Sequence, residues 1–259
     1  IALWDIVAKH SNLPLCNLLG SVGEKKLPAY ASLWRYEDAE AVQDRCQYAK
    51  NLGYKYIKLH EVFTSEVKAA RNILGDDIPI MVDTNCPWTK DEARQMLNSW
   101  EEYSLYWVEE PINPPEDFES LSNLRADIFI PIAAGENACT SFEFKKMFDA
   151  EAVDYAQPSV TKVGGITEFK KINHLADTYG VQVMPHSPYF GPGFLATLHL
   201  AQSMPNPGLL ERFFIDFEAY LYPKEIFTPQ DGFFKTPDTI GLGLDPDKDV
   251  IKDFAVKTL

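Results

Sequence analysis

Cysteines are few in this sequence, and they are not paired in motifs. Cys16, Cys46, Cys86 and Cys139 are the only four among 259 residues, and no Cys-x-x-Cys pair occurs. Disulfide-stabilised secreted domains and structural zinc sites both rely on sets of cysteines at short, regular spacings, so neither class of protein fits. We therefore expect a protein of a reducing compartment, the cytoplasm.

Long apolar runs and an excess of basic side chains are also absent. No stretch approaches the roughly 20 apolar residues that span a bilayer, and no charged segment precedes an apolar one at the start. The 38 acidic and 24 basic side chains give a net charge of -14. Binding to phosphates needs clustered Lys and Arg, so we expect no membrane and no nucleic-acid partner.

The remaining composition is that of a globular domain. Hydrophobic residues make up 46% and aromatic residues 13% of the chain, enough for a large core without disulfides. Single α/β barrels commonly run to roughly 200–250 residues, which favours one large domain. Ile1 already lies inside a helical pattern with no methionine or capping residue before it, so we expect the chain to begin within a domain.

Short β-branched or aromatic runs alternate with amphipathic stretches along most of the chain, the pattern of repeated βα units. The expected strands are 27–32, 54–60, 78–83, 105–109, 130–134, 152–156, 182–186 and 208–211. The expected helices include 36–52, 64–74, 90–103, 141–149, 165–179 and 194–203. Eight such units predict a closed parallel barrel. A doubly wound sheet is the alternative, but the Gly-x-Gly-x-x-Gly that it would carry after the first strand is absent.

Polar residues stand at or just after the carboxyl ends of successive expected strands, 23 to 27 residues apart. They are Lys58, Asp83, Glu109, Glu136, Ser159, His186 and Glu211. The carboxyl ends of parallel barrel strands open onto one face, where barrel active sites form. We therefore expect these side chains to converge on one site.

Three of these residues, Asp83, Glu109 and Glu136, are carboxylates from consecutive strands. Three converging carboxylates do not all stay ionised without a cation. Oxygen ligands without cysteine favour Mg²⁺ over zinc. The alternative for each acid alone is a helix cap or a surface ion pair, but the regular spacing of three favours the metal site.

Several motifs in order resemble one known family. They are Met81-Val82-Asp83-Thr84-Asn85, Trp107-Val108-Glu109-Glu110-Pro111, Ala134-Gly135-Glu136-Asn137, Lys162-Val163-Gly164-Gly165-Ile166-Thr167 and Met184-Pro185-His186. They are similar to the barrel domain of the enolase superfamily, in its mandelate racemase/muconate lactonizing enzyme branch. The similarity covers nearly the whole chain.

The resemblance implies a modified TIM barrel, (β/α)7β, without the N-terminal α+β capping domain that such proteins usually carry. We expect the barrel with its leading helix in residues 1–215. Residues 216–259 lose the βα rhythm, and we expect this tail to pack against the capping domain that is missing from this chain. Relatives of this kind are commonly oligomers, so we expect a homo-oligomer.

The resemblance also implies the chemistry. Mg²⁺ would be held by Asp83, Glu109 and Glu136, and the reaction would begin with removal of the proton α to a substrate carboxylate, through an enediolate. Where the family usually has Lys-x-Lys, this chain has Lys58-Leu59-His60. Alternation along a strand places residues 58 and 60 on one face. The resemblance implies that Lys58 contacts the substrate carboxylate and that His60, in the family's base position, is the base.

His186 stands where racemase-like members have a catalytic histidine, but its usual aspartate partner is replaced by Ser159. We expect His186 to act as an acid rather than a strong base; a buried structural histidine is the alternative. The other expected substrate contacts are Glu211, Ser159, Lys162, Asn85 and Tyr189. Glu211 and Lys162 have ion pairs with neighbours as their plain alternatives. The remaining histidines lie in helical patterns and are expected to be structural.

One base facing one unpartnered histidine favours dehydration of a sugar acid to a 2-keto-3-deoxy acid. The alternatives are a racemase, an epimerase or a cycloisomerase of a hydroxy acid. A further alternative is a non-catalytic barrel subunit, although three clustered acids argue against it.

Overall fold

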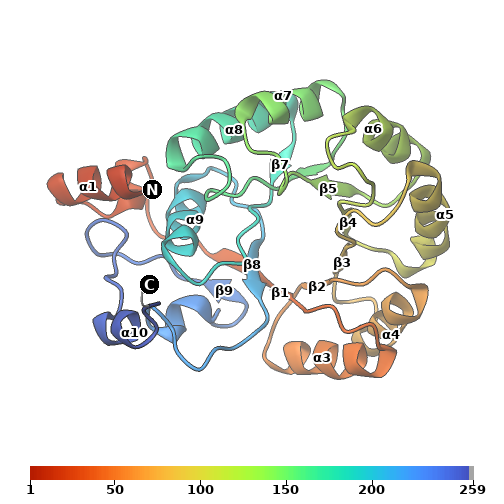
Figure 1. Cartoon of the computed structure of the whole chain (residues 1–259), viewed down its shortest axis with the longest axis horizontal. Helices are drawn as coiled ribbons and strands as arrows, with labels where there is room; N and C mark the ends of the chain where they lie inside the picture. The colour runs from red at the N-terminus through yellow and green to blue at the C-terminus, as the bar shows by residue number, and fades with distance from the viewer. Residues whose placement is uncertain (257–259) are drawn as a thin grey trace.

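A ring of short parallel strands forms the centre of the fold in this computed structural model, which describes residues 1–256 (Figure 1). In those residues the ring has eight strands: β1 (Leu27–Ser32), β2 (Ile57–Leu59), β3 (Ile80–Asp83), β4 (Trp107–Glu109), β5 (Ile132–Ala134), β6 (Tyr155–Ala156), β7 (Gln182–Val183) and β8 (Leu210–Phe213). Their order is β7-β6-β5-β4-β3-β2-β1-β8, with every pair parallel. The strands therefore follow one another around the ring in chain order.

The two ends of this sheet, β7 and β8, meet at a glycine. Leu209 donates its backbone N–H to the sulfur of Met184 at 3.1 Å, and a Cβ on Gly208 would overlap the carbonyl oxygen of Val183. Only glycine allows the two backbones to approach this closely. The sheet thus curls until its two edge strands, β7 and β8, lie side by side.

Helices follow each of the first seven strands and surround the ring (Figure 1). They are α3 (Ala39–Asn51), α4 (Thr64–Leu74), α5 (Lys90–Trp100) with the 3-10 turn η1 (Glu101–Tyr103), α6 (Phe118–Asp127), α7 (Ser141–Asp149), α8 (Ile166–Tyr179) and α9 (Pro192–Ser203). The predicted (β/α)7β barrel is confirmed. Helices α4 and α7 have their predicted bounds, and α3 begins later than predicted because the side chain of Asp38 caps it through the N–H of Ala41. Helix α6 was not among the predicted helices.

The strands separate two buried regions. Outward-facing side chains pack against the helices in one large core. Inward-facing side chains form a smaller cluster inside the ring: Tyr30, Met81, Trp107, Ala133, Met184 and Leu209. Because side chains alternate along a strand, the next inward positions on β1, β3, β4 and β8 are Ser32, Asp83, Glu109 and Glu211. An apolar floor therefore supports a polar layer at the carboxyl ends of the strands.

The beginning and the end of the chain pack together on one side of the barrel (Figure 1). They contribute α1 (Ala2–His10), α2 (Leu15–Leu18), the turn η2 (Lys224–Phe227), the short strand β9 (Phe233–Phe234) and α10 (Lys248–Asp253). Strand β9 pairs antiparallel with the start of β1, and Phe227 and Phe234 bury their rings against Phe194 of α9. Asp5 accepts a hydrogen bond from the N–H of Leu242 at 2.8 Å. Contact with a separate N-terminal domain stays a prediction.

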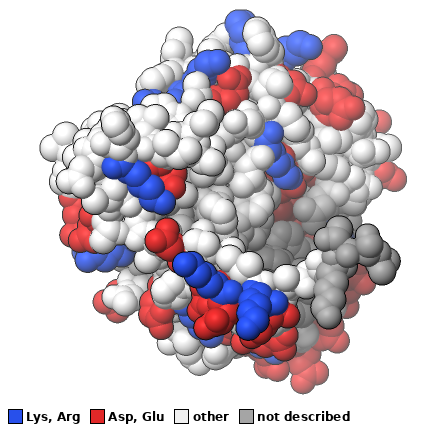
Figure 2. Space-filling view, turned by 60° about the vertical axis from the view of Figure 1, so that its left-hand side comes forward, with Lys and Arg blue, Asp and Glu red and all other residues white. Residues whose placement is uncertain are grey.

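The surface carries its charges in small mixed groups on the face that Figure 2 shows, with no single basic area. Helix α1 exposes Leu3, Ile6 and Val7. None of the helices in residues 1–256 combines the length and apolar character needed to span a bilayer.

Gly135, just after β5, lets Glu136 enter the polar layer. Its φ is +135°, and a Cβ there would lie 2.8 Å from Cε1 of Phe144 and 3.0 Å from the backbone nitrogen of Gln157. This conformation is rare for residues with a side chain. The chain can therefore turn here only because residue 135 is glycine.

We predict that Gly135→Ala lowers the free energy of unfolding by about 2 kcal/mol or more, because strain and overlap add. Denaturant unfolding measures the change. Gly191→Ala is the matched control, since Gly191 has a negative φ and no atom within 4 Å of its Cβ position. Equal stability of the Gly135→Ala variant and the unmodified protein would contradict the prediction.

Candidate metal and acid–base site

The carboxyl ends of the strands bring the predicted polar residues together. Lys58 and His60 come from β2 and the residue after it, Asp83 from β3, Glu109 from β4 and Glu211 from β8. Glu136, Ser159 and His186 follow β5, β6 and β7. Most of these side chains are buried and contact one another. They form the candidate site.

Lys58 lies at the centre of the polar layer and is fully buried. Its Nζ is 3.2 Å from Asp83 Oδ2, 3.0 Å from Glu109 Oε1 and 3.3 Å from Glu211 Oε1. Burial alone would lower the pKa of Lys58, but the surrounding carboxylates outweigh it and raise the pKa well above its usual value. The ammonium group is therefore held in its charged form by three acids.

Asp83, Glu109 and Glu136 each offer one carboxylate oxygen, and these oxygens lie within 4.8 Å of one another. Burial acts to raise the pKa of Asp83, but Lys58 and His60 outweigh it and hold that pKa well below its usual range. Burial and then the charge of Asp83 raise the pKa of Glu109 well above its usual value. The ammonium group of Lys58 therefore does not supply enough positive charge for Asp83, Glu109 and Glu136 together. A cation bound among them would supply the rest.

The donor set fits Mg²⁺. It consists of three carboxylate oxygens and no sulfur, which suits a hard cation that keeps water in its remaining positions.

Neighbouring side chains fix the orientation of these acids. Asn85 donates to Asp83 Oδ1 from its backbone N–H at 3.0 Å and from its Nδ2 at 2.9 Å. Glu110 accepts from Nδ2 of Asn137 at 2.6 Å, and burial followed by the charge of Glu136 raises the pKa of Glu110 to about 7. Glu110 Oε2 also accepts from Sγ of Cys86 at 3.3 Å, and the Glu110 carboxylate is not one of the three clustered ligand groups.

His60 is held at both ring nitrogens. Its Nδ1 lies 2.5 Å from the carbonyl oxygen of Leu33, and its Nε2 lies 3.2 Å from Asp83 Oδ2. Because a carbonyl oxygen only accepts, Nδ1 carries the proton in this contact. The Nε2 atom therefore faces the acids, where its partner is Asp83 Oδ2.

His186 pairs with Glu136 and not with Ser159, the residue that replaces the aspartate usual in the family. Its Nε2 is 2.9 Å from Glu136 Oε2, and its buried Nδ1 has no protein partner within residues 1–256. Burial acts to raise the pKa of Glu136, but the hydrogen bond from His186 outweighs it and brings the pKa to about 2. Ser159 instead bonds the hydroxyl group of Tyr189 at 2.5 Å and that of Thr161 at 3.1 Å.

Glu211 and Lys162 take different places. Glu211 is buried; its Oε1 accepts from Ser32 at 2.7 Å and its Oε2 accepts from the N–H of Ser187 at 3.0 Å. An ion pair with a neighbour, the alternative for Glu211, is present with Lys58 at 3.3 Å and not with Arg212, because Arg212 bonds Asp216 and nearby carbonyl groups. Lys162 is more exposed, with its Nζ 3.4 Å from Glu136 Oε1.

Sequence reasoning missed three residues of this site. Ser32 and Gln157 are inward positions that alternation along β1 and β6 would have found, because Tyr30 and Tyr155 face the same way. Gln157 is fully buried, and neither atom of its amide has a protein partner in the described part of the chain. Arg35 lies beyond the end of β1, where no pattern marks it.

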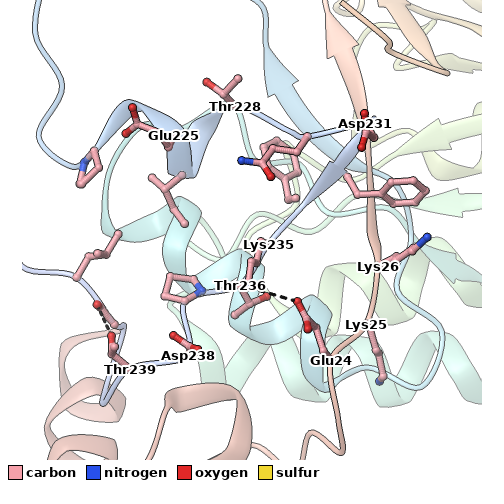
Figure 3. Close-up of a pocket in the computed structure, with 18 residues that line it drawn as sticks. Glu24, Lys25, Lys26, Glu225, Thr228, Asp231, Lys235, Thr236, Asp238 and Thr239 are labelled. Carbon is pink, nitrogen blue, oxygen red and sulfur yellow. Dashed lines mark hydrogen bonds and ion pairs between the residues drawn. The ribbon is translucent and has the colours of Figure 1, made fainter.

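A separate cleft of about 810 Å³ lies at the opposite end of the barrel (Figure 3). It runs between the segment before β1, including Lys25 and Lys26, and the tail with Glu225, Asp231 and Lys235. Its charges are of both signs and loosely paired: Lys235 and Glu24, 3.8 Å apart, are 75% and 76% exposed. The chemistry-bearing cluster is at the other end.

We predict that Lys58→Met lowers the free energy of unfolding by about 3–5 kcal/mol at about pH 7, because it leaves buried carboxylates unpaired. Lys58 depresses the pKa of Asp83. The stability from this pairing is therefore present above the unfolded pKa of about 4 and is lost as pH falls, so the deficit of the variant should narrow in acid.

Unfolding of both proteins at neutral and acidic pH measures this effect. Lys145→Met is the control, since it breaks an exposed pair with Asp149 on α7 and should change stability little. A Lys58→Met deficit that is absent, or that grows in acid, would refute the assignment.

Comparison with known proteins agrees with this geometry. The family model described as "Enolase C-terminal domain-like" matches residues 40–250. The arabinonate dehydratase of Saccharolobus solfataricus is 31% identical over 99% of this chain and 71% of its own length. The L-talarate/galactarate dehydratase of Salmonella typhimurium is 32% identical over 94% of this chain and 61% of its own length. The chain thus spans well under the full length of these relatives.

Solved structures lead to the same family. The 3,6-anhydro-D-galactonate cycloisomerase from Zobellia galactanivorans is 32% identical, with a TM-score of 0.89 over 99% of this chain and 74% of that one. An L-talarate/galactarate dehydratase mutant, liganded with Mg and L-glucarate, is 30% identical, with a TM-score of 0.84 over 97% of this chain and 63% of that one. By sequence and by fold, this chain belongs to the mandelate racemase/muconate lactonizing branch of the enolase superfamily, as its C-terminal barrel domain.

Proposed function

We propose that this protein is an Mg²⁺-dependent enzyme that dehydrates a sugar acid to a 2-keto-3-deoxy acid. The observation that carries the proposal is the convergence of Asp83, Glu109 and Glu136 within 4.8 Å, with one histidine on each side. When bound, Mg²⁺ would supply the positive charge that stabilises an enediolate next to the substrate carboxylate. The dehydratases among the relatives and the Mg-liganded mutant support the same class of reaction.

His60 is the proposed base. Its Nδ1–H is fixed by the carbonyl group of Leu33, so Nε2 is the ring nitrogen that faces the site and is free to exchange a proton there once Asp83 Oδ2 binds a cation instead. This nitrogen removes the proton from C2 of the substrate, and the electron pair of the broken C–H bond becomes part of a carbon–carbon double bond. Lys58 is buried two residues before His60, on the same face of β2. Its charge offsets the negative charge of the acids and of the substrate carboxylate that it is proposed to contact.

His186 is the proposed acid. It lies across the ring from His60, in the segment after β7, and its Nε2 donates to Glu136 Oε2 at 2.9 Å. As the C3–O bond breaks, His186 gives a proton to the departing hydroxide, which leaves as water. The enol that remains becomes the 2-keto acid when a proton returns to C3. Glu211, Ser159, Lys162, Asn85 and Tyr189 stay proposed substrate contacts.

A racemase or epimerase is the second candidate, and the two histidines on opposite sides of the acids favour it. Inversion at C2 needs a good base on each side of the substrate. Only His60 has its second nitrogen bonded to a protein acceptor, whereas Nδ1 of His186 has no protein partner within residues 1–256. We therefore place dehydration first. A cycloisomerase also needs a single base, and a non-catalytic barrel gives no reason to bury three clustered acids.

The domain arrangement belongs to the same proposal. Residues 1–215 would supply the catalytic groups, and the tail from residue 216 would contact a capping domain.

We predict that the protein with Mg²⁺ and a panel of sugar acids in D₂O removes the C2 proton signal and forms a 2-keto-3-deoxy product, both followed by proton NMR. The same experiment without Mg²⁺, in the presence of EDTA, should show neither change. Deuterium in recovered substrate with inverted configuration and no keto product would instead establish the epimerase. Turnover that persists in EDTA would reject the metal-dependent mechanism.

We predict that Glu136→Gln weakens Mg²⁺ binding at least tenfold and abolishes turnover, because the amide removes one anionic ligand. The fold should be kept, since Glu136 is only partly buried and the amide oxygen of glutamine can still accept from His186. Isothermal titration with Mg²⁺ and thermal unfolding measure the two effects. Glu119→Gln, an exposed position on α6, controls for the loss of one charge. Unchanged Mg²⁺ affinity in Glu136→Gln would remove Glu136 from the proposed ligands.

A further inference from the structure

Arg35 connects three segments at the rim of the candidate site. It lies on the chain just after β1 and is half-buried. Its Nε donates to the carbonyl oxygen of His60 at 2.9 Å, and its Nη2 donates to the carbonyl oxygen of Thr84 and to Oδ1 of Asn85, both at 3.1 Å. One rigid guanidinium group therefore joins the segments that follow β1, β2 and β3.

The contact with Asn85 determines which oxygen of Asp83 faces the site. Because Oδ1 of Asn85 accepts from Arg35, its Nδ2 is left to donate to Asp83 Oδ1, which also accepts the backbone N–H of Asn85. Both hydrogen bonds from Asn85 therefore go to Asp83 Oδ1. Asp83 Oδ2 is the oxygen that faces Lys58 and His60, each at 3.2 Å.

The contact with Thr84 supports an uncommon backbone. Asn85 and Cys86, the next two residues, both have positive φ, +55° and +53°. A residue with a side chain is strained in this conformation and keeps it only where its surroundings hold it. Two hydrogen bonds hold this turn. Arg35 donates to the carbonyl group of Thr84, and the backbone carbonyl group of Glu110 accepts the N–H of Cys86 at 2.7 Å.

The contact with His60 completes the link to the proposed base. The backbone carbonyl group of His60 is bound by Arg35, while its ring is bound by Leu33 and faces Asp83. The same guanidinium group thus restrains the base and, through Asn85, the acid beside it.

We propose that Arg35 is a positioning residue that sets the orientation of Asp83 and His60 together before a cation binds. The inference rests on the proposed function, because it assigns Asp83 to a metal site. The positive charge of Arg35 would by itself oppose a second cation nearby. Its contribution to binding is therefore geometric, and a lysine cannot reproduce it because an ammonium group lacks the planar fork.

The test is Mg²⁺ affinity by isothermal titration for the unmodified protein, Arg35→Lys, Arg35→Gln and Asn85→Ala. We expect Arg35→Lys to bind Mg²⁺ about tenfold more weakly at unchanged charge, the size of effect typical of groups that orient ligands. Arg45→Lys, an exposed arginine on α3, is the matched control and should bind as the unmodified protein does. Thermal unfolding of each variant separates this loss from a loss of folded protein.

A double variant shows whether Arg35 acts through Asn85. If it does, Arg35→Lys combined with Asn85→Ala loses little more affinity than Asn85→Ala alone, whereas independent effects would multiply. Two results would overturn the inference and leave the proposed function standing. One is equal Mg²⁺ affinity of Arg35→Lys and the unmodified protein. The other is tighter Mg²⁺ binding by Arg35→Gln with no loss of Mg²⁺ affinity in Arg35→Lys. Failure of the unmodified protein to bind Mg²⁺ would overturn both.

Discussion

The buried ammonium group of Lys58 is the interaction on which the rest of the site depends. Asp83, Glu109 and Glu211 come from three strands and end within 3.3 Å of this one group. Acids buried so close together would repel one another and favour their protonated forms. With Lys58 among them, anionic side chains can share the end of the barrel in the folded state. The pKa of Glu109 stays raised even so, and a cation among Asp83, Glu109 and Glu136 would supply the positive charge that Lys58 does not.

The polar layer also depends on what lies beneath it. The ring of Tyr30 lies 5.8 Å from the Lys58 ammonium group, and the indole of Trp107 donates to Glu109 Oε2 at 3.2 Å. These aromatic rings fill the barrel below the site and offer their few polar atoms upward. A rigid apolar floor of this kind leaves charged side chains little freedom to move away from one another. The acids are therefore held close together even though they repel.

Much of this arrangement could be predicted from the sequence, because it follows from periodicity. A spacing of one βα unit put Asp83, Glu109 and Glu136 at successive strand ends, and the barrel geometry brought them together. Alternation along β2 placed Lys58 and His60 on one face in the same way. The contacts of His186 could not be predicted, because they depend on the path of the loop that carries Tyr189 to Ser159 and leaves His186 to Glu136. Arg35 lies in an irregular segment, where neither period applies.

The way in which the strands share the site has a consequence for how its chemistry can change. Each strand end contributes one or two side chains, and each is followed by its own loop and helix, so a replacement at one end leaves the others in place. His60 and Ser159 both differ from the residues usual in the family, on β2 and after β6, while the three acids between them still converge. The groups proposed for acid–base chemistry and those proposed to hold a cation thus lie at different strand ends and can be exchanged separately. New reactions can arise by single exchanges at its rim while the charged centre stays as it is.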